Sequence, residues 1–592
     1  MTRRSSQREA GSACPNLHKA SSILREIFCR IRASSFKRYI RELLVELCLI
    51  DTTPKADPRR MQAAEESCFA ILERELRSLG FPNAKIERRP IDPAIQKHPA
   101  YSLLHFTKTP QRPQGLSAEE TYAGRSNLLY FLEGEERKPR GKSVALNAHI
   151  DVVAPYFPPR VVGTKVFGRG ACDDKGPVVS MIAALKVLSE AMTAADLKWN
   201  HNVMAMFVVE EETGGNGTLS LVMDRALKKM YDSVLVGECT GLKFYPANRG
   251  AVWYRAQLKP LKGVPPLELF SFINEEMEKE GQAIRVESRH PLFPQRPVQT
   301  CHGIIGPFGE HPSRICGEVS FTIAFACRLR EPLKALVRDC LEAGLSQYVG
   351  LYGDKTKVKD PSTGKPMVTR HYDLQIQNRS IQVNVHGATG HMGAIRERDG
   401  AITKMAHLVR SLVLSKRRIE SAAGGPVSLE LATRDEDRAP SMGLVFEGGQ
   451  GFLPTHSVTD VMNRLRQAAQ LGADYYLRRA GRSGRGEDIV SVTYEKLHND
   501  AYAGDPDSLS ARNAVEAAKT CGLWNGEPIL GWTVSCDARL FATEYPGMDV
   551  LTFGPGQLIY AHSDQEQIDL EEIRAAAEFL AVFLLRQTGT LS

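Results

Sequence analysis

The sequence predicts an α/β protein whose main domain is interrupted by an inserted α+β domain, and three observations predict it. Short apolar strands alternate with helices up to about residue 250, as at Lys175–Ala191 and Val203–Val209. That pattern is lost over residues 252–484 and then returns, with helical spacing at Ala511–Cys521 and Leu570–Arg586. A chain of 592 residues also exceeds what one hydrophobic core usually supports. We therefore expect at least two domains.

The elements of the main domain follow from apolar periodicity. Residues 38–80 have the spacing of two helices, separated at Pro54 and Pro58. Val203–Val209 is a continuous apolar run, as expected of a strand buried on both faces. The final helix is predicted to start with a capping box formed by Asp569 and Glu572. Further strands are expected at Asn127–Phe131, Ser143–Ala148, Ser233–Val236 and Val550–Phe553.

The inserted domain is the least regular part of the sequence, because prolines interrupt residues 260–297. Beyond them we expect strands at Val319–Leu329 and Ser380–His386 and an amphipathic helix at Asp399–Leu414. Arg479–Gly486 is predicted to be a flexible return linker. No internal repeat stands out.

Three segments follow from this organisation. We expect a basic, poorly ordered arm at residues 1–35, a main domain built from residues 36–251 and 485–592, and the inserted domain at 252–484. The arm has two interpretations, a frayed start of the first helix and a transit-like segment.

The charge balance argues against a nucleic-acid partner. The net charge is +7, and residues 1–40 alone hold nine basic and two acidic side chains, so the rest of the chain is neutral. No run of about 18 apolar residues exists, so no membrane span is expected. The twelve cysteines show no regular spacing, which is typical of reduced thiols and favours a cytoplasmic protein.

Histidine and carboxylate side chains follow the predicted strands. His149 and Asp151 come directly after the strand Ser143–Ala148, and alternation along a strand allows Asp151 to lie behind His149 and orient its ring. Glu211 and Glu212 follow the buried strand, and Glu238 follows the next one. Open α/β sheets bind ligands at the carboxyl ends of their strands, so these side chains are expected to converge.

Two further residues complete the set. Asp173 lies in a glycine-rich segment before the predicted helix at Lys175, where the alternative role is that of a helix N-cap. His562 precedes the last helix. Two histidines with several carboxylates form a mixed nitrogen and oxygen donor set, which suits zinc, cobalt or manganese. Paired divalent ions activate water and polarise carbonyls, so the pattern indicates hydrolysis, with Glu212 as a ligand and Glu211 as the general base.

The five short segments that carry these residues, at His149–Asp151, Asp173, Glu211–Glu212, Glu238 and His562, resemble a known family. It is the family of di-zinc hydrolases that includes aminoacylase, acetylornithine deacetylase, succinyl-diaminopimelate desuccinylase and glutamate carboxypeptidase. The segment Asp173–Pro177 resembles the dipeptidase branch in particular. The resemblance implies a three-layer zinc-hydrolase catalytic domain with a mixed, mostly parallel sheet and an inserted lid or dimerisation domain.

The resemblance also implies roles for single residues. His149, Asp173 and Glu238 would hold one metal ion, and Asp173, Glu212 and His562 the other. Asp151 would orient His149, and Glu211 would transfer the proton.

Two residues outside the metal set are implied to act on the substrate. His391, between glycines of the insertion, resembles a histidine that contacts substrate, often across a dimer, so a homodimer through the inserted domain is expected. Arg539 resembles an arginine that binds a substrate carboxylate, a task that suits its bidentate geometry.

The expected activity is metal-dependent hydrolysis of a peptide or N-acyl amide bond in a small substrate, as in a carboxypeptidase, dipeptidase or deacylase. Two alternatives stay open. A di-zinc aminopeptidase shares similar ligands but lacks this lid, and a metal-binding scaffold without activity need not keep Glu211.

Overall fold

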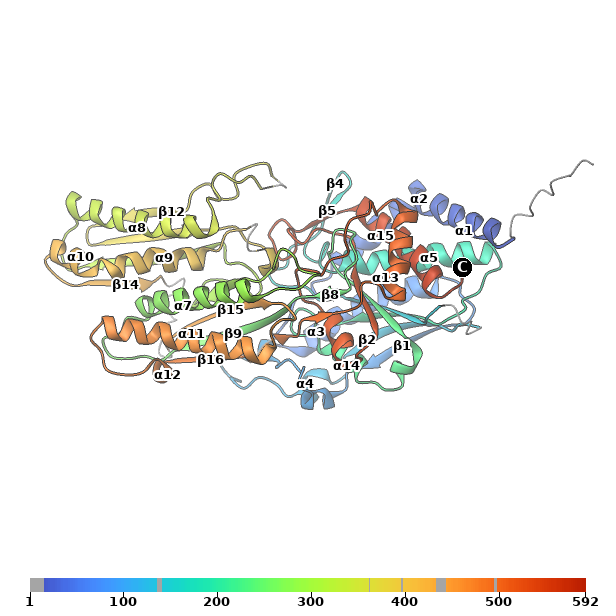
Figure 1. Cartoon of the computed structure of the whole chain (residues 1–592), viewed down its shortest axis with the longest axis horizontal. Coiled ribbons are helices and arrows are strands. Elements are labelled where there is room, and N and C mark those ends of the chain that lie inside the picture. The colour runs from blue at the N-terminus through green and yellow to red at the C-terminus, as the bar shows by residue number, and fades with distance from the viewer. Residues whose placement is uncertain are drawn as a thin grey trace, which may run out of the picture.

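The computed structural model describes residues 15–135, 141–360, 363–394, 398–432, 443–494 and 498–591. Figure 1 shows an elongated molecule with two parts side by side. The buried apolar side chains form two main clusters, one from residues 23–244 and 514–591 and the other from residues 247–492. Each part therefore has its own hydrophobic core.

The first part is built on a six-stranded sheet with the order β1-β2-β6-β3-β7-β19. Strands β6, β3, β7 and β19 are parallel, and β1 and β2 form an antiparallel edge. Every residue of β2, β3, β6 and β7 is buried, so both faces of the sheet are covered and the predicted layered architecture is confirmed. The strands are β1 Ala84–Pro90, β2 Ser126–Leu132, β3 Val144–His149, β6 Val203–Val208, β7 Ser233–Gly237 and β19 Asp549–Phe553.

Helices from both ends of the chain pack together beside this sheet. Helix α5 is apolar on nearly all sides and contacts α1, α2 and α15. It is the one described helix long and apolar enough to cross a membrane, and 78% of its apolar window is buried, so burial in the core accounts for its composition. The helices are α1 Pro15–Ile31, α2 Ser34–Cys48, α3 Pro58–Arg77, α5 Lys175–Ala194, α13 Leu509–Cys521 and α15 Leu570–Gln587.

The expectation of a poorly ordered arm over residues 1–35 is wrong for residues 15–31. These residues form α1, whose side chains Ile23, Ile27 and Ile31 are buried in the first core. The three isoleucines recur at every fourth position and give the basic segment one apolar face. The remainder of the arm, residues 1–14, lies outside the described residues.

The inserted part contains two antiparallel sheets, with the orders β10-β15-β9-β16 and β12-β13-β11-β14. Helices α7 and α11 pack together beside the first sheet, and α8 and α9 pair with each other. The first set comprises β9 Gly250–Leu258, α7 Pro266–Glu287, β10 Thr300–Ile305, β15 Leu444–Phe452, α11 Val458–Arg479 and β16 Val490–Thr493. The second set comprises β11 Glu318–Phe325, α8 Glu331–Tyr352, β12 Tyr372–Ile376, β13 Ser380–His386, α9 Ala401–Leu414 and β14 Val427–Leu431.

The two sets have the same architecture, which was not apparent from the sequence. In the first sheet, the central strand β9 is followed by α7 and the edge strand β10, and the central strand β15 by α11 and the edge strand β16. In the second sheet, β11 is followed by α8 and the edge strand β12, and β13 by α9 and the edge strand β14. Each edge strand therefore lies beside the central strand of the other unit. The second set lies between β10 and β15 of the first, and its two β-α-β units occur in the same chain order. Because one copy interrupts the other, no constant repeat distance exists for a sequence comparison to detect.

Two local expectations are corrected. The insertion does not end at residue 484, because β16 and β17 (His498–Asn499) pair with β9. The capping box at α15 is absent, since Asp569 accepts from the backbone N–H of Glu571, while the Glu572 carboxylate accepts from Gly556 N and Gln557 Nε2. The smaller elements are α4 Ala118–Tyr122, α6 Asn216–Val222, α10 Lys416–Ala423, α12 Gly486–Ile489, α14 Ala538–Glu544, β4 Arg160–Val162, β5 Lys165–Phe167, β8 Ala247–Asn248, β18 Tyr502–Ala503 and β20 Gln567–Asp569.

Candidate metal centre

Three parallel strands end at the same edge of the six-stranded sheet and bring the predicted side chains together. His149 is the last residue of β3 and lies opposite Val208, the last residue of β6. Glu212 follows β6, and Glu238 follows β7, which pairs with β3 on its other side. The carboxyl ends of adjacent parallel strands therefore form one edge, as the sequence predicted.

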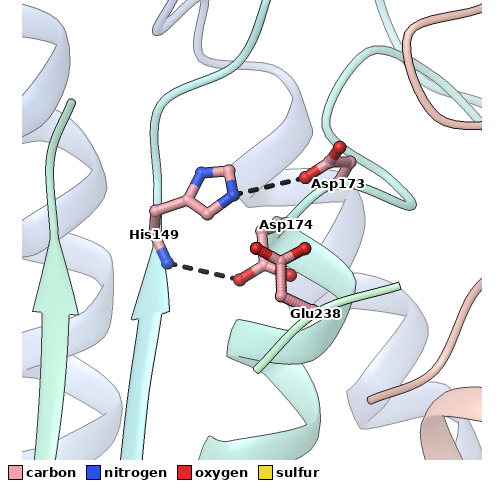
Figure 2. A group of neighbouring side chains, drawn as sticks. All are labelled: His149, Asp173, Asp174 and Glu238. Carbon is pink, nitrogen blue, oxygen red and sulfur yellow. Dashed lines mark hydrogen bonds and ion pairs between the residues drawn. The ribbon is translucent and has the colours of Figure 1, made fainter. Parts of the chain in front are cut away.

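The structure places the predicted ligands in two buried groups. The first contains His149, Asp173, Asp174 and Glu238, and the second contains Asp173, Glu212 and His562. Within each group the ligand atoms lie within 4.8 Å of one another. Figure 2 shows the first group, with Asp174 at the start of α5, where its carboxylate accepts from the backbone N–H of His149 at 3.2 Å.

Asp173 joins the two groups. Its Oδ1 lies 3.2 Å from His149 Nε2, and its Oδ2 lies 3.3 Å from His562 Nε2. His562 Nε2 also lies 3.0 Å from Glu212 Oε1. One carboxylate oxygen thus faces each histidine, the arrangement needed for a carboxylate that bridges two ions. The N-cap alternative for Asp173 is not what the structure shows, because Asp174 holds that position and makes no capping bond.

The donor set fits divalent metal ions. His149 Nε2 and Asp174 Oδ1 are buried and make no hydrogen bond. Burial, together with the neighbouring carboxylates, raises the pKa of both Asp174 and Glu238 well above the usual range. Buried like charges at this density require positive charge to remain ionised, and a mixed nitrogen and oxygen set suits zinc and its neighbours.

Asp151 was expected to orient His149 through its carboxylate, but its main contact with the ring is through the backbone carbonyl. His149 Nδ1 lies 3.0 Å from the Asp151 backbone carbonyl and 3.5 Å from its carboxylate. The carboxylate accepts from the backbone N–H groups of Glu211 and Glu212, at 3.1 and 3.0 Å. Asp151 therefore orients the ring mainly through its carbonyl. Its side chain fixes the loop after β6 that carries Glu211 and Glu212, called the glutamate loop below.

Glu211 lies beside the two groups without belonging to either. Its Oε2 is 4.0 Å from His149 Nε2, and its side chain is 14% exposed. Burial is the main factor that raises the pKa of Glu211 well above the usual carboxylate value. A carboxylate next to the ligands but outside both groups has the placement of a proton acceptor.

Glu210 directly precedes Glu211 and Glu212 in the sequence, but its side chain points away from the metal centre. Its backbone φ is 65°, in the left-handed region. Its carboxylate accepts from Tyr122 Oη at 2.8 Å and from the buried guanidinium of Arg125, which also pairs with Glu65. This network anchors the loop that carries Glu211 and Glu212, and no short motif could have revealed it.

Glu566 is a buried residue that the sequence reading missed. Its Oε1 accepts from the backbone N–H groups of Gly170, Cys172 and Asp173, at 2.9, 3.1 and 3.1 Å. Its Oε2 pairs with Arg169 at 2.5 Å, and the two side chains are at most 1% exposed. Glu566 thus ties the loop of Asp173 to the segment of His562, four residues away in the sequence. The sequence held one sign of this role, which is that Glu566 lies only four residues after the proposed ligand His562.

His391 reaches the centre from the inserted domain of the same chain. Its ring lies 4.6 Å from the ring of His562, and its backbone N–H donates to Ala561 O at 3.1 Å. Burial and the nearby His562 lower the pKa of His391 well below its usual value, so the ring is neutral. Its Nδ1 accepts from the backbone N–H of Gly393 at 2.9 Å, which places the ring hydrogen on Nε2.

Arg539 contacts the loop that follows Glu212, at Gly214. Its Nη2 donates to Gly214 O at 3.1 Å, its Nε makes no hydrogen bond, and the residue is 3% exposed. Its role toward a substrate carboxylate stays a prediction.

Comparison with known proteins agrees with this geometry. The model of peptidase family M20/M25/M40 matches residues 145–586, so the chain belongs to this family. A peptidase M20 domain-containing protein of Schizosaccharomyces pombe is 31% identical over 155 residues, 25% of this chain and 36% of that protein. A probable carboxypeptidase of Aspergillus terreus is 27% identical over 158 residues, 25% of this chain and 34% of that protein. The chain thus matches only about a third of the length of these relatives.

Two solved structures share the fold over nearly the whole chain. Human carnosine dipeptidase 1 has a TM-score of 0.54 at 15% identity, covering 96% of this chain and 100% of that one. The dipeptidase Dug1p of Saccharomyces cerevisiae has a TM-score of 0.53 at 16% identity, covering 97% and 99%.

Proposed function

We propose that this protein hydrolyses a peptide or N-acyl amide bond in a small substrate, with two divalent metal ions, most consistent with zinc. One observation supports the proposal above all others. Two buried ligand groups share Asp173, and Glu211 lies beside them outside both groups. Membership in a peptidase family supports the same reaction.

The residues divide the work of the reaction between them. His149, Asp173 and Glu238 would hold one ion, and Asp173, Glu212 and His562 the other, with Asp174 near the first. When bound, the ions supply Lewis acidity, which activates water near neutral pH and polarises the carbonyl. Glu211 accepts the proton of the attacking water and delivers it to the leaving amine.

The inserted domain contributes His391 to the same reaction. Its neutral ring carries the hydrogen on Nε2, so it can donate to the carbonyl oxygen as negative charge develops there. Because His391 comes from the same chain, one chain holds every proposed residue. A homodimer through the inserted domain stays a proposal that the active site does not require.

The substrate is proposed as a dipeptide, a peptide that loses its C-terminal amino acid, or an N-acyl amino acid, with Arg539 binding its carboxylate. Metal analysis of the purified protein, followed by turnover assays on N-blocked and free-amine dipeptides and on N-acyl amino acids, tests this. We expect close to two metal ions per chain and hydrolysis that a chelator abolishes. Turnover of free-amine substrates alone would favour the aminopeptidase alternative, and metal binding without any turnover would favour the scaffold.

A further inference from the structure

The two histidines of the centre differ in what holds the ring nitrogen that faces away from it. His149 Nδ1 is held by Asp151, within the same domain. His562 Nδ1 lies 3.3 Å from the hydroxyl of Ser313, a residue of the inserted domain between β10 and β11. Ser313 is 4% exposed, so water does not compete for this contact. Histidines that bind metal usually need such an outer partner, because it sets the tautomer and the orientation of the ring.

A second histidine determines which way the Ser313 hydroxyl points. Ser313 Oγ lies 2.6 Å from His311 Nδ1, and the same nitrogen accepts the backbone N–H of Ser313 at 3.2 Å. A nitrogen that accepts a backbone N–H carries no hydrogen of its own, so the Ser313 hydroxyl must donate to it. The hydroxyl oxygen is then left to accept the hydrogen on His562 Nδ1. This places the lone pair of His562 on Nε2, toward Asp173 and Glu212.

Neighbouring contacts fasten this segment to the loop of His562. Arg314 Nε donates to the backbone carbonyl of His562 at 2.9 Å, and its guanidinium pairs with Asp564. Met392 N donates to Ser313 O at 2.8 Å, so the segments of Ser313 and His391 are hydrogen-bonded to each other. The inserted domain therefore contacts the backbone and the ring of His562 together.

We propose that Ser313, supported by His311, is a positioning residue that holds His562 in its metal-binding tautomer. Metal affinity at the position of Asp173, Glu212 and His562 then depends on the inserted domain lying against the main domain. At the position of His149, Asp173 and Glu238 the outer partner lies within the main domain, so metal affinity there does not depend on the inserted domain. The inference rests on the proposed function only in that both require metal ions.

The test is a titration of the metal-free protein with Co²⁺, followed by visible absorption and by competition with a chelator. We expect Ser313→Ala to weaken one of two binding events by about 10- to 100-fold, the usual effect of removing an outer partner, and to leave the other unchanged. Ser313→Thr keeps the hydroxyl and is expected to restore near wild-type affinity. Ser320→Ala is the matched control, since this serine is also in the inserted domain but donates to Asn384, at 2.8 Å.

A double-mutant cycle tests the role of His311. In a protein that already carries Ser313→Ala, His311→Ala should cause no further loss of Co²⁺ affinity, because His311 acts on His562 through the Ser313 hydroxyl. Two binding events of wild-type affinity in Ser313→Ala would overturn the inference and leave the proposed function intact. A wild-type protein that binds no Co²⁺ would instead overturn both. Thermal unfolding of the metal-free variants separates a local effect from a loss of folding.

Discussion

Glu211 carries the chemical step in the proposed reaction, although it belongs to neither ligand group. Glu211→Gln keeps the shape of the side chain and removes its ability to accept a proton. We expect the metal content to stay at the wild-type level and kcat to fall by about 10²- to 10⁴-fold, the range typical of general acid–base catalysis. Metal analysis and steady-state kinetics on one preparation check this. A kcat near that of the wild type would remove Glu211 from this role.

His562 belongs to one ligand group only, which makes its removal selective. His562→Ala takes away the nitrogen that faces both Asp173 and Glu212. We expect metal content to fall from about two ions per chain toward one, because the group that contains His149 keeps all its members. Elemental analysis after dialysis measures this. Full occupancy of both positions in the variant would contradict the ligand assignment.

Glu566 matters for stability, since it balances the buried guanidinium of Arg169 and accepts three backbone N–H groups. Glu566→Gln removes the charge and leaves Arg169 unpaired. We expect the free energy of unfolding of the metal-free protein to fall by about 3 kcal/mol, as for other broken buried ion pairs. Denaturant unfolding measures the change. Glu516→Gln, at an exposed helix position, is the control and should change stability by less than about 0.5 kcal/mol.

At the scale of elements, the end of β3 is coupled to the loop after β6 through Asp151. Its carboxylate accepts two backbone N–H groups of the glutamate loop. Asp151→Asn presents an amide group that can satisfy only one of them and leaves the other unpaired. We expect a reduced kcat, of about 10-fold or more, because a small displacement of Glu211 misaligns the proton transfer. Unchanged kinetics would show that the loop is held by the Arg125 network alone.

Strand positions were predictable from sequence at this scale, and their partners were not. The runs around Asn127, Ser143, Val203 and Ser233 became β2, β3, β6 and β7 within two residues at each end. Continuous apolar runs bounded by polar residues are a local signal, and both faces of these strands are buried. The Val319–Leu329 strand ended four residues early, at Phe325, because apolar content alone does not mark where pairing stops.

At the scale of the whole molecule, the inserted domain brings His391 to the centre of its own chain. We therefore expect the activity per chain to be independent of protein concentration over a range in which any dimer dissociates. Steady-state assays combined with analytical ultracentrifugation check this. Activity that falls in step with dimer dissociation would show that a partner chain completes the site.

His149, Asp151, Asp173, Glu211, Glu212, Glu238, His391, Arg539 and His562 could all be selected from the sequence. Residue type and position after a strand are properties of a short stretch of chain, and they select the metal set and Glu211. His391 and Arg539 were selected only because their segments resemble those of a known family. The outer contacts could not be selected. Ser313 and His562 are 249 residues apart, and Arg169 and Glu566 are 397 residues apart. Nothing in either local stretch marks these pairs, since hydrogen bonds between distant segments arise only from packing.

The donor types and the strand ends that carry them were thus encoded locally, through apolar runs and the residues that follow them. The folded chain alone decided that α1 packs in the core, that Glu210 turns away from its neighbours, and that the inserted domain touches His562. These features depend on burial and on the matching of distant donors and acceptors. Such interactions exist only when the surrounding segments have excluded water together.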